Sequence, residues 1–270
     1  MVRIGFIGTG SMGGMLIRKF VETGAFKAGD IMASNRSPEK ARAIASQTGI
    51  RAGKDNRDVA AHSDIIFLCV RPLDVKGVLK ELTGLLTKDK LVVSIASDVH
   101  ISDISAYCDS RVVLAIPSVA AEFSKGILLV AFDDKATEAD RELILSAFGR
   151  IGRPVEVKEK DFEVCAQLTS CAPAYIASLM QEFANAAIRR EGISPALAEL
   201  LVKETLAGTA ELLNKVNGFD EVVTRVATKG GITEEGVKVI KEDAPRMYDG
   251  ILDVTLAKHA LVKEKIREQK

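Results

Sequence analysis

The first fourteen residues constrain the fold of this chain more than any other stretch. Arg3–Ile7 is a short apolar run that predicts a β-strand, and a helical pattern follows it as far as Gly24. Between them, Gly8, Gly10 and Gly13 have the spacing G-x-G-x-x-G. At this spacing the first glycine permits a tight turn, the second lets the backbone approach a pyrophosphate, and the third lets the helix pack close to the sheet.

The same stretch predicts where a dinucleotide binds. The N-terminus of the helix offers free N–H groups and a partial positive charge to a pyrophosphate. A strand precedes the glycines, a helix follows them, and a second strand comes at the expected distance, so we favour dinucleotide binding over a purely structural turn. We expect the cofactor to be bound here by Gly8, Gly10, Ser11, Met12 and Gly13.

The end of the second predicted strand, Asp30–Arg36, indicates which dinucleotide binds. An NAD site usually has Asp or Glu there, whereas this chain has Ser34, Asn35 and Arg36. The guanidinium of Arg36 suits the 2′-phosphate of NADP, so the sequence favours NADPH over NADH. The alternative is a solvated arginine in a surface loop. Ser37 is expected to cap the next helix and to add donors for the phosphate.

Strand and helix patterns alternate along residues 1–160. The alternation predicts an α/β fold, a Rossmann-type doubly wound and mainly parallel sheet that binds NADP. The further strands are expected at 65–70, 91–95, 111–116, 126–131 and 154–157. Ligands of such sheets bind at the carboxyl ends of the strands. One crevice should therefore be lined by the strand exits at Gly8–Gly13, Ser34–Arg36, Val70–Pro72, Ala96–Asp98 and Pro117–Ser118.

Residues 161–270 carry only helical patterns and predict a C-terminal all-helical domain. We expect a long helical stretch over 161–190 with a kink at Pro173, and a helix from Ser194 that Gly218 ends. Shorter helices are expected at 220–227 and 233–241, with a last helix from Pro245 onward. The apolar stripes exceed what so small a domain buries alone, so a homodimer or higher homo-oligomer is expected.

Composition excludes several classes of partner. Lys and Arg together number 37, as do Asp and Glu, so a formal net charge of zero gives no reason to expect nucleic acid or an acidic membrane. No apolar run approaches the ~20 residues that span a bilayer, and no export signal is expected. The cysteines have no C-x-x-C spacing and the three histidines no ligand-pair spacing. They predict a cytoplasmic protein with reduced thiols and no metal site.

Two motifs in the helical half complete a resemblance to the pyrroline-5-carboxylate reductases. They are Leu168–Tyr175 (LTSCAPAY) and Val226–Thr233 (VATKGGIT), which join the N-terminal glycines and the Asn35-Arg36 pair. The resemblance covers nearly the whole chain in order and length. It includes Asn56, Arg71-Pro72 where the family has Val-Lys-Pro, and Ser94–Ser97 where the family has Ser-Ile-Ala-Ala-Gly.

These enzymes reduce a cyclic imine to proline with NAD(P)H. The resemblance therefore implies a Rossmann domain followed by an interleaved helical dimerisation domain, which would bind an imino acid. It extends the expected cofactor-binding residues to Asn56, Val70, Arg71, Pro72 and Ala96.

The departures from the family gather where the substrate is expected. This chain has Ile116–Ser118 where the family has Met-Pro-Asn, and Thr169–Tyr175 where the family has Ser-Gly-Ser-Gly-Pro-Ala-Tyr. It has Thr228–Thr233 where the family has Ser-Pro-Gly-Gly-Thr-Thr. The reaction type is favoured, while the exact substrate stays open. The expected substrate-binding residues are Ser170, Cys171, Thr228, Lys229, Gly230, Gly231 and Thr233.

Four of these residues keep alternatives. Gly230-Gly231 before a helix is a suitable carboxylate cradle, and the Thr233 hydroxyl is the candidate catalytic group or a simple helix N-cap before Glu234. Ser170 and Cys171, together with the preceding Thr169, line a pocket or are tolerated at a proline kink. Lys229 adds a backbone donor and a positive charge, either in solvent or in a pocket for a bulkier or more acidic substrate.

Three functions remain open at this point. The first is NADPH-dependent reduction of 1-pyrroline-5-carboxylate to proline. The second is reduction of another imino or oxo acid by a related enzyme. The third is a non-catalytic dinucleotide-binding regulatory protein, which the substitutions at Ser118, Cys171 and Lys229 keep in view.

Overall fold

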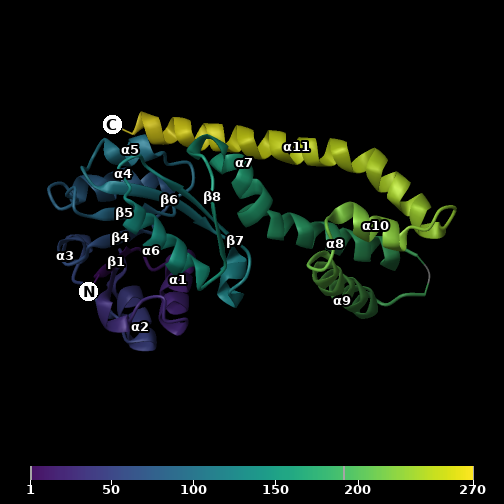
Figure 1. The fold of residues 1–270 in the computed structure, drawn as a ribbon, viewed down its shortest axis with the longest axis horizontal. Coiled ribbons are helices and arrows are strands. Elements are labelled where there is room, and N and C mark those ends of the chain that lie inside the picture. The colour runs from purple at the N-terminus through teal and green to yellow at the C-terminus, as the bar shows by residue number, and fades with distance from the viewer. Residues whose placement is uncertain (1, 191, 270) are drawn as a thin grey trace. The chain divides into compact units, whose positions relative to one another are not determined.

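The computed structural model describes residues 2–190 and 192–269. The chain divides into two compact units, the first formed by Met1–Cys171 with Leu256–Lys270 and the second by Ala172–Thr255 (Figure 1). The first unit contains a sheet with helices, and the described residues of the second unit form helices and their connections without a strand, so the predicted fold class is confirmed. The predicted domain boundary between residues 160 and 161 stays a prediction. In the structure the end of the last helix belongs to the first unit.

A single eight-stranded sheet forms the centre of the first unit. The strand order is β3-β2-β1-β4-β5-β6-β7-β8, and every neighbouring pair is parallel except β6 and β7. The strands are β1 (Ile4–Ile7), β2 (Ile31–Ser34), β3 (Arg51–Ala52), β4 (Ile65–Leu68), β5 (Leu91–Ser94), β6 (Arg111–Pro117), β7 (Ile127–Phe132) and β8 (Arg153–Glu156). The sequence did not predict β3, because two exposed edge residues carry no periodicity.

The strand order reverses beside β1. The chain winds outward from β1 to β2 and β3, and then returns to place β4 on the other side of β1. Ile4 pairs with Ile31 of β2 on one side and with Ile65 of β4 on the other. In sheets of this kind the crevice opens at the reversal point, so the topology predicts a ligand site above the carboxyl ends of β1 and β4.

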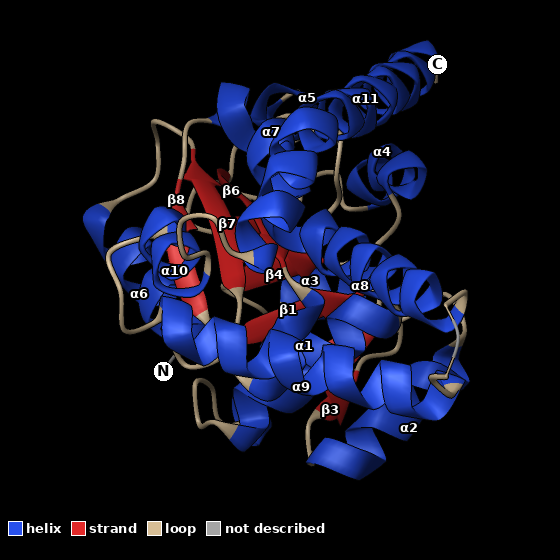
Figure 2. Ribbon diagram, turned by 90° about the vertical axis from the view of Figure 1, so that its right-hand side faces the viewer, coloured by secondary structure: helices blue, strands red, loops and turns tan. Residues whose placement is uncertain are grey.

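Helices cover both faces of the sheet (Figure 2). One face packs against α1 (Ser11–Glu22), α2 (Pro38–Thr48) and α6 (Glu138–Gly149). The other packs against α3 (Asn56–Ala61), α4 (Pro72–Glu81), α5 (Ile101–Ser105), α7 (Phe162–Ala166) and the end of α11 (Ile232–Glu268). Aromatic rings fill the first face, where Phe6 stacks on Phe67 with ring centroids 4.7 Å apart. Burial of these apolar side chains on both faces explains why the strands are continuous apolar runs.

The segment expected to kink at Pro173 contains a local irregularity just before it. α7 is followed by a π-helical stretch, Gln167–Cys171, and then by α8 (Ala172–Ile188). Proline has no N–H to donate to the preceding turn, and a widened turn accommodates this. The π-helical stretch belongs to the first unit, whose first chain segment ends at Cys171.

The second unit contains α8, α9 (Pro195–Leu213), α10 (Phe219–Val226) and the first part of α11. The predicted break before Pro245 is wrong, since α11 is one helix from Ile232 to Glu268 with Pro245 inside it. A proline removes one hydrogen bond, and the many other bonds of so long a helix outweigh that loss. Large apolar side chains of this unit are exposed, such as Phe183, Phe219 and Ile232. Within the described residues, no helix is both long and apolar enough to cross a bilayer.

Candidate functional site

The glycine loop connects β1 to α1 in contact with the end of β4. Gly8 has φ +103°, and a Cβ built on it would lie 2.4 Å from the carbonyl oxygen of Cys69. A Cβ on Gly13 would lie 2.3 Å from the carbonyl oxygen of Gly8. Neither position accepts a larger side chain without moving backbone, so both glycines are required by packing.

Gly10 differs from the other two glycines of the loop. A Cβ built on it would have no heavy atom within 4 Å, and its φ of −69° is open to any residue. Folding of the chain therefore does not require a glycine here. The open space beside Gly10 fits the close approach of a pyrophosphate to the backbone.

The start of α1 suits an anion. Gly10 occupies the N-cap position, no side chain caps the helix there, and its first turn has no acidic residue. The adjacent Thr9 Oγ1 is buried, and among the described residues it has no hydrogen-bond partner. Uncapped N–H groups, the positive end of the helix dipole and an unpaired hydroxyl together fit the pyrophosphate of a dinucleotide.

The polar residues at the end of β2 hold the loop in place. Asn35 Oδ1 accepts a hydrogen bond from the Thr9 N–H at 3.0 Å. Ser34 Oγ donates to Asn56 Oδ1 at 2.8 Å, and Asn56 Nδ2 donates to Glu81 at 2.8 Å. These contacts give three of the predicted cofactor-binding residues a structural role that the sequence did not reveal.

Two arginines lie near one carboxylate beyond β2 and β4. Arg71 Nε donates to Asp74 Oδ2 at 2.8 Å. This hydrogen bond, with a smaller contribution from the positive charge of Arg36, holds the pKa of Asp74 below its usual range. Arg36 is exposed. Positive charge from the two strand exits therefore converges at this end of the site.

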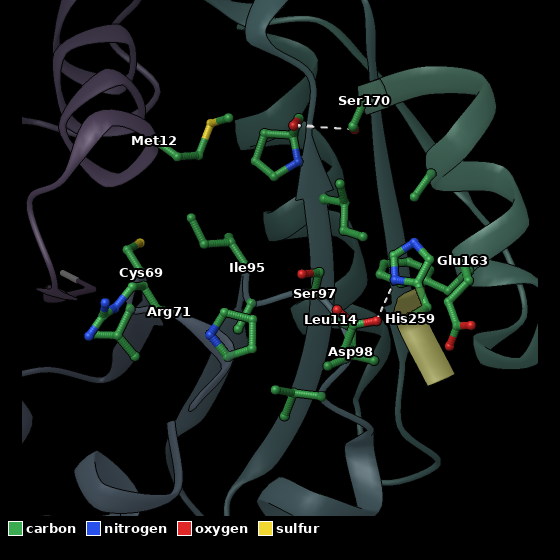
Figure 3. A pocket seen from close by; sticks show the side chains of 18 of the residues that line it. Met12, Cys69, Arg71, Ile95, Ser97, Asp98, Leu114, Glu163, Ser170 and His259 are labelled. Carbon is green, nitrogen blue, oxygen red and sulfur yellow. Dashed lines mark hydrogen bonds and ion pairs between the residues drawn. The ribbon is translucent and has the colours of Figure 1, made fainter. Parts of the chain in front are cut away.

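A cleft of about 510 Å³ opens over the strand ends of the first unit (Figure 3). Gly10–Gly13 and Val70–Pro72 line one part of it, Ala96 the next, and Ser170 and Cys171 the opposite wall. The structure thus brings two of the expected substrate-binding residues to the same cleft as the glycine loop. Gly8, Ser34, Asn35, Arg36 and Asn56 are not among its lining residues, although they lie in the same unit.

Several polar residues of the cleft were missed as site residues. His259 contacts Asp98, and His100 Nδ1 lies 3.0 Å from Glu159 Oε1. The sequence placed Asp98 at a strand exit but gave it no partner, because His259 is 161 residues away. No local pattern in the sequence signals this contact.

Cys69 lies at the end of β4, next to the glycine loop. Burial raises the pKa of its thiol, which disfavours the reactive thiolate. Within the part of the chain that the structure describes, no group of three or more His, Cys, Asp or Glu side chains is arranged to hold a metal ion.

The predicted carboxylate cradle lies in the second unit. Its first N–H, that of Gly230, donates to the Glu234 carboxylate at 2.7 Å, and the Gly231 N–H donates to the Thr228 carbonyl at 2.9 Å. Thr233 and Lys229 are exposed. The interpretation of Thr233 as a helix N-cap is wrong, because α11 already begins at Ile232.

Comparisons with known proteins agree with this architecture. Residues 3–98 match the family described as "NADP oxidoreductase coenzyme F420-dependent", and residues 159–259 match "Pyrroline-5-carboxylate reductase dimerisation". The chain is 31% identical to "Pyrroline-5-carboxylate reductase 3" of Bacillus subtilis over 271 residues, covering all of both chains. It is 30% identical to "ComE operon protein 4" of the same bacterium over 260 residues, 96% of this chain and 95% of the other.

A solved structure extends the similarity to three dimensions. The pyrroline-5-carboxylate reductase of Coxiella burnetii superposes with a TM-score of 0.84 at 26% identity, covering 99% of this chain and 98% of the other. Fold and cleft define a nicotinamide-dinucleotide-dependent oxidoreductase of the doubly wound class. Within that class, the chain belongs to the pyrroline-5-carboxylate reductase family.

The glycine loop yields a prediction that separates folding from cofactor binding. Gly13→Ala should lower the free energy of unfolding by about 1–3 kcal/mol, because its Cβ meets backbone. Gly10→Ala should change it by less than about 0.5 kcal/mol, and should weaken NADPH binding by roughly tenfold or more by filling the pyrophosphate space. Urea denaturation and calorimetric titration measure the two effects. Undiminished NADPH binding by Gly10→Ala would refute the placement of the pyrophosphate.

Proposed function

We propose that the protein reduces 1-pyrroline-5-carboxylate to L-proline with NADPH as the hydride donor. The observation that carries this proposal is the cleft of the first unit, where an uncapped α1 N-terminus beside an open Gly10 faces Ser170 and Cys171. Membership of the pyrroline-5-carboxylate reductase family supports the choice of substrate.

The chain's own residues would hold the dinucleotide in three places. Gly10–Gly13 would receive the pyrophosphate, and Val70, Pro72 and Ala96, at the exits of β4 and β5, would receive the nicotinamide half. Arg36 and Arg71 would hold the 2′-phosphate at the adenosine end, where the phosphate would displace Asp74 from the Arg71 guanidinium. The attraction of the two guanidiniums for the 2′-phosphate is the physical reason to favour NADPH.

The chemistry divides between cofactor and protein. When bound, the nicotinamide supplies a hydride to the carbon of the C=N bond. The protein orients the imine in the cleft and keeps water away from it, and the apolar lining of Ile95, Leu114 and Ile116 serves both purposes.

The substrate carboxylate would bind at Thr228–Thr233. In the structure a carboxylate, that of Glu234, already accepts the Gly230 N–H. Gly230 has φ +75°, so this donor is presented by a backbone conformation that favours glycine. A substrate carboxylate would replace Glu234, and the Thr233 hydroxyl would act as the catalytic donor to the substrate nitrogen. Lys229 adds a positive charge beside that anion.

A second candidate is reduction of another imino or oxo acid by the same cleft. The specific observation in its favour is that Ser118, where the family has asparagine, is buried and uses its Oγ to accept from the Ala120 N–H. Cys171 and Lys229 also depart from the family motif. The hydride chemistry would be the same, and only the recognised acid would differ.

The proposed function includes self-association of the chain and a cytoplasmic location. The match of residues 159–259 to a dimerisation family supports self-association, and the exposed apolar side chains of the second unit supply a surface for it. We propose a homodimer or higher homo-oligomer acting in the cytoplasm on a small imino acid.

The proposed function is tested by turnover. Purified protein with NADPH and 1-pyrroline-5-carboxylate should oxidise NADPH and form proline in equal amounts. A panel of other cyclic imino acids and 2-oxo acids with an amine tests the second candidate. Rapid turnover of a panel member with none of 1-pyrroline-5-carboxylate would replace the first candidate by the second. NADPH binding with no turnover of any acid would favour a regulatory protein.

Arg36 provides the test of cofactor choice. Charge-assisted hydrogen bonds to phosphate contribute about 1.5–3 kcal/mol, so Arg36→Ala should weaken NADPH binding by roughly tenfold or more. NADH affinity should stay nearly unchanged, because NADH has no 2′-phosphate. The matched control is Arg42→Ala, which removes an exposed arginine of the following helix, α2. Equal losses of NADPH and NADH binding by Arg36→Ala would contradict the assignment.

Thr233 and Glu234 test the carboxylate site. Thr233→Ala should raise the KM for every carboxylate substrate by roughly three- to tenfold, the value of a neutral hydrogen bond. Glu234→Ala should lower that KM, because it removes a competing carboxylate from the Gly230 N–H. Steady-state kinetics at saturating NADPH measures both. If both variants behave as the unmodified protein, the carboxylate binds near Thr169–Cys171 instead.

A further inference from the structure

Asp98 has a backbone conformation that few non-glycine residues adopt. Its φ of 63° is left-handed, and among the described non-glycine residues only Ser124 shares a positive φ. It lies in the loop after β5, which ends at Ser94, it lines the cleft, and its side chain is only 5% exposed. Glycine adopts this conformation without strain, and aspartate is one of the few other residues that does so. The buried carboxylate of Asp98 needs a partner to offset the loss of its hydration.

The partner of that carboxylate is His259 on α11. His259 Nδ1 lies within hydrogen-bond distance of Asp98 Oδ1, as the dashed line in Figure 3 shows. On the other side of the ring, His259 Nε2 lies 2.8 Å from Gln167 Nε2. The carboxylate requires a proton on Nδ1, so Nε2 is the acceptor and the Gln167 amide donates to it. Both ring nitrogens are engaged, and the ring is fixed.

The three residues join segments that are far apart in the sequence. Asp98 ends the β5 exit, Gln167 begins the π-helical stretch, and His259 belongs to the last part of α11. Ala96 lies two residues before Asp98, while Ser170 and Cys171 lie on the same π-helical stretch as Gln167. The contacts therefore connect two opposite walls of the cleft.

The wall at β5 is the nicotinamide side of the cleft. The adenosine of a dinucleotide lies toward the end of β2, so the nicotinamide half crosses β1 toward β4 and β5. The opposite wall carries Ser170, whose hydroxyl donates to the Pro117 carbonyl at 3.4 Å. The distance between these walls decides how close an imine carbon comes to the nicotinamide.

We propose that Asp98, His259 and Gln167 form a positioning bridge that fixes the nicotinamide wall, Ala96–Asp98, against the wall that carries Ser170 and Cys171. The expected effect of the bridge on kcat rests on the proposed function. Its effect on the bound dinucleotide can be measured without any substrate. Its three residues are positioning residues and take no proton from the substrate, because both nitrogens of His259 are already engaged.

Two substitutions at one position test the bridge. Asp98→Gly relieves the left-handed backbone but removes the acceptor of His259, whereas Asp98→Asn tolerates the backbone and keeps an acceptor oxygen. We expect Asp98→Gly to lower kcat by roughly tenfold to a hundredfold, as misplacement of reacting groups does. Its NADPH Kd should stay within about twofold, since Asp98 is not among the residues proposed to hold the pyrophosphate and the 2′-phosphate. Asp98→Asn should recover most of kcat.

A spectroscopic readout makes the test independent of turnover. The fluorescence of the reduced nicotinamide reports how firmly that ring is held, so the enhancement on binding should be reduced in Asp98→Gly and in His259→Ala, and retained in Asp98→Asn. The matched control is Lys263→Met, which breaks the ion pair of α11 with Glu163 on α7 and leaves the bridge intact. It should keep both kcat and fluorescence.

The outcomes distinguish the bridge from the proposed function. If Asp98→Gly matches or exceeds Asp98→Asn in kcat and in nicotinamide fluorescence, Asp98 is only a tolerated strained residue and the proposal is overturned. If the unmodified protein turns over no imino acid, the proposed function fails, and the fluorescence comparison alone then decides for or against the bridge. Equal losses of kcat and of nicotinamide fluorescence in Lys263→Met and Asp98→Gly would also overturn the proposal. Any loss of a contact of α11 would then be enough to produce the effect.

Discussion

The close contact between the β1–α1 turn and the end of β4 is the constraint on which the rest of this structure depends. The carbonyl of Cys69 and that of Gly8 leave no room for a Cβ at Gly8 or Gly13, so the turn is held against the sheet. This contact places the uncapped start of α1 beside the point where the strand order reverses. The anion site, the path of a dinucleotide and the position of the cleft all follow from that one arrangement.

The cleft gains a second wall from residues distant in sequence. α7 and the end of α11 pack on the sheet face that also holds α3, α4 and α5. They bring Ser170, Cys171 and His259 to the strand exits. The first unit thus contains both the glycine loop and the wall that carries Ser170 and Cys171. In the second unit the Gly230 N–H donates to the Glu234 carboxylate, and large apolar side chains are exposed.

Sequence patterns predicted the features that depend on local order. The strand–turn–helix at the glycine loop, the buried strands and the helical C-terminal half were predicted from periodicity and residue type. The structure confirms these elements. β3 and the continuity of α11 through Pro245 could not be predicted, because edge pairing and the net stability of a long helix are not visible in local patterns. The Asp98–His259 contact joins residues 161 apart, and only the folded chain brings them together. The structural roles of Ser34 and Asn56 were missed for the same reason, since the hydrogen bond between them closes over 22 residues.

The central claim is that a hydride passes from a nicotinamide held over the strand ends to the carbon of a cyclic imine. Its most direct measurement follows an isotope in the product. Protein, 1-pyrroline-5-carboxylate and NADPH that carries deuterium at the transferable position of the nicotinamide should yield proline heavier by one deuterium, with the label on the former imine carbon. Proline without the label, or NADPH consumption without proline, would contradict the account.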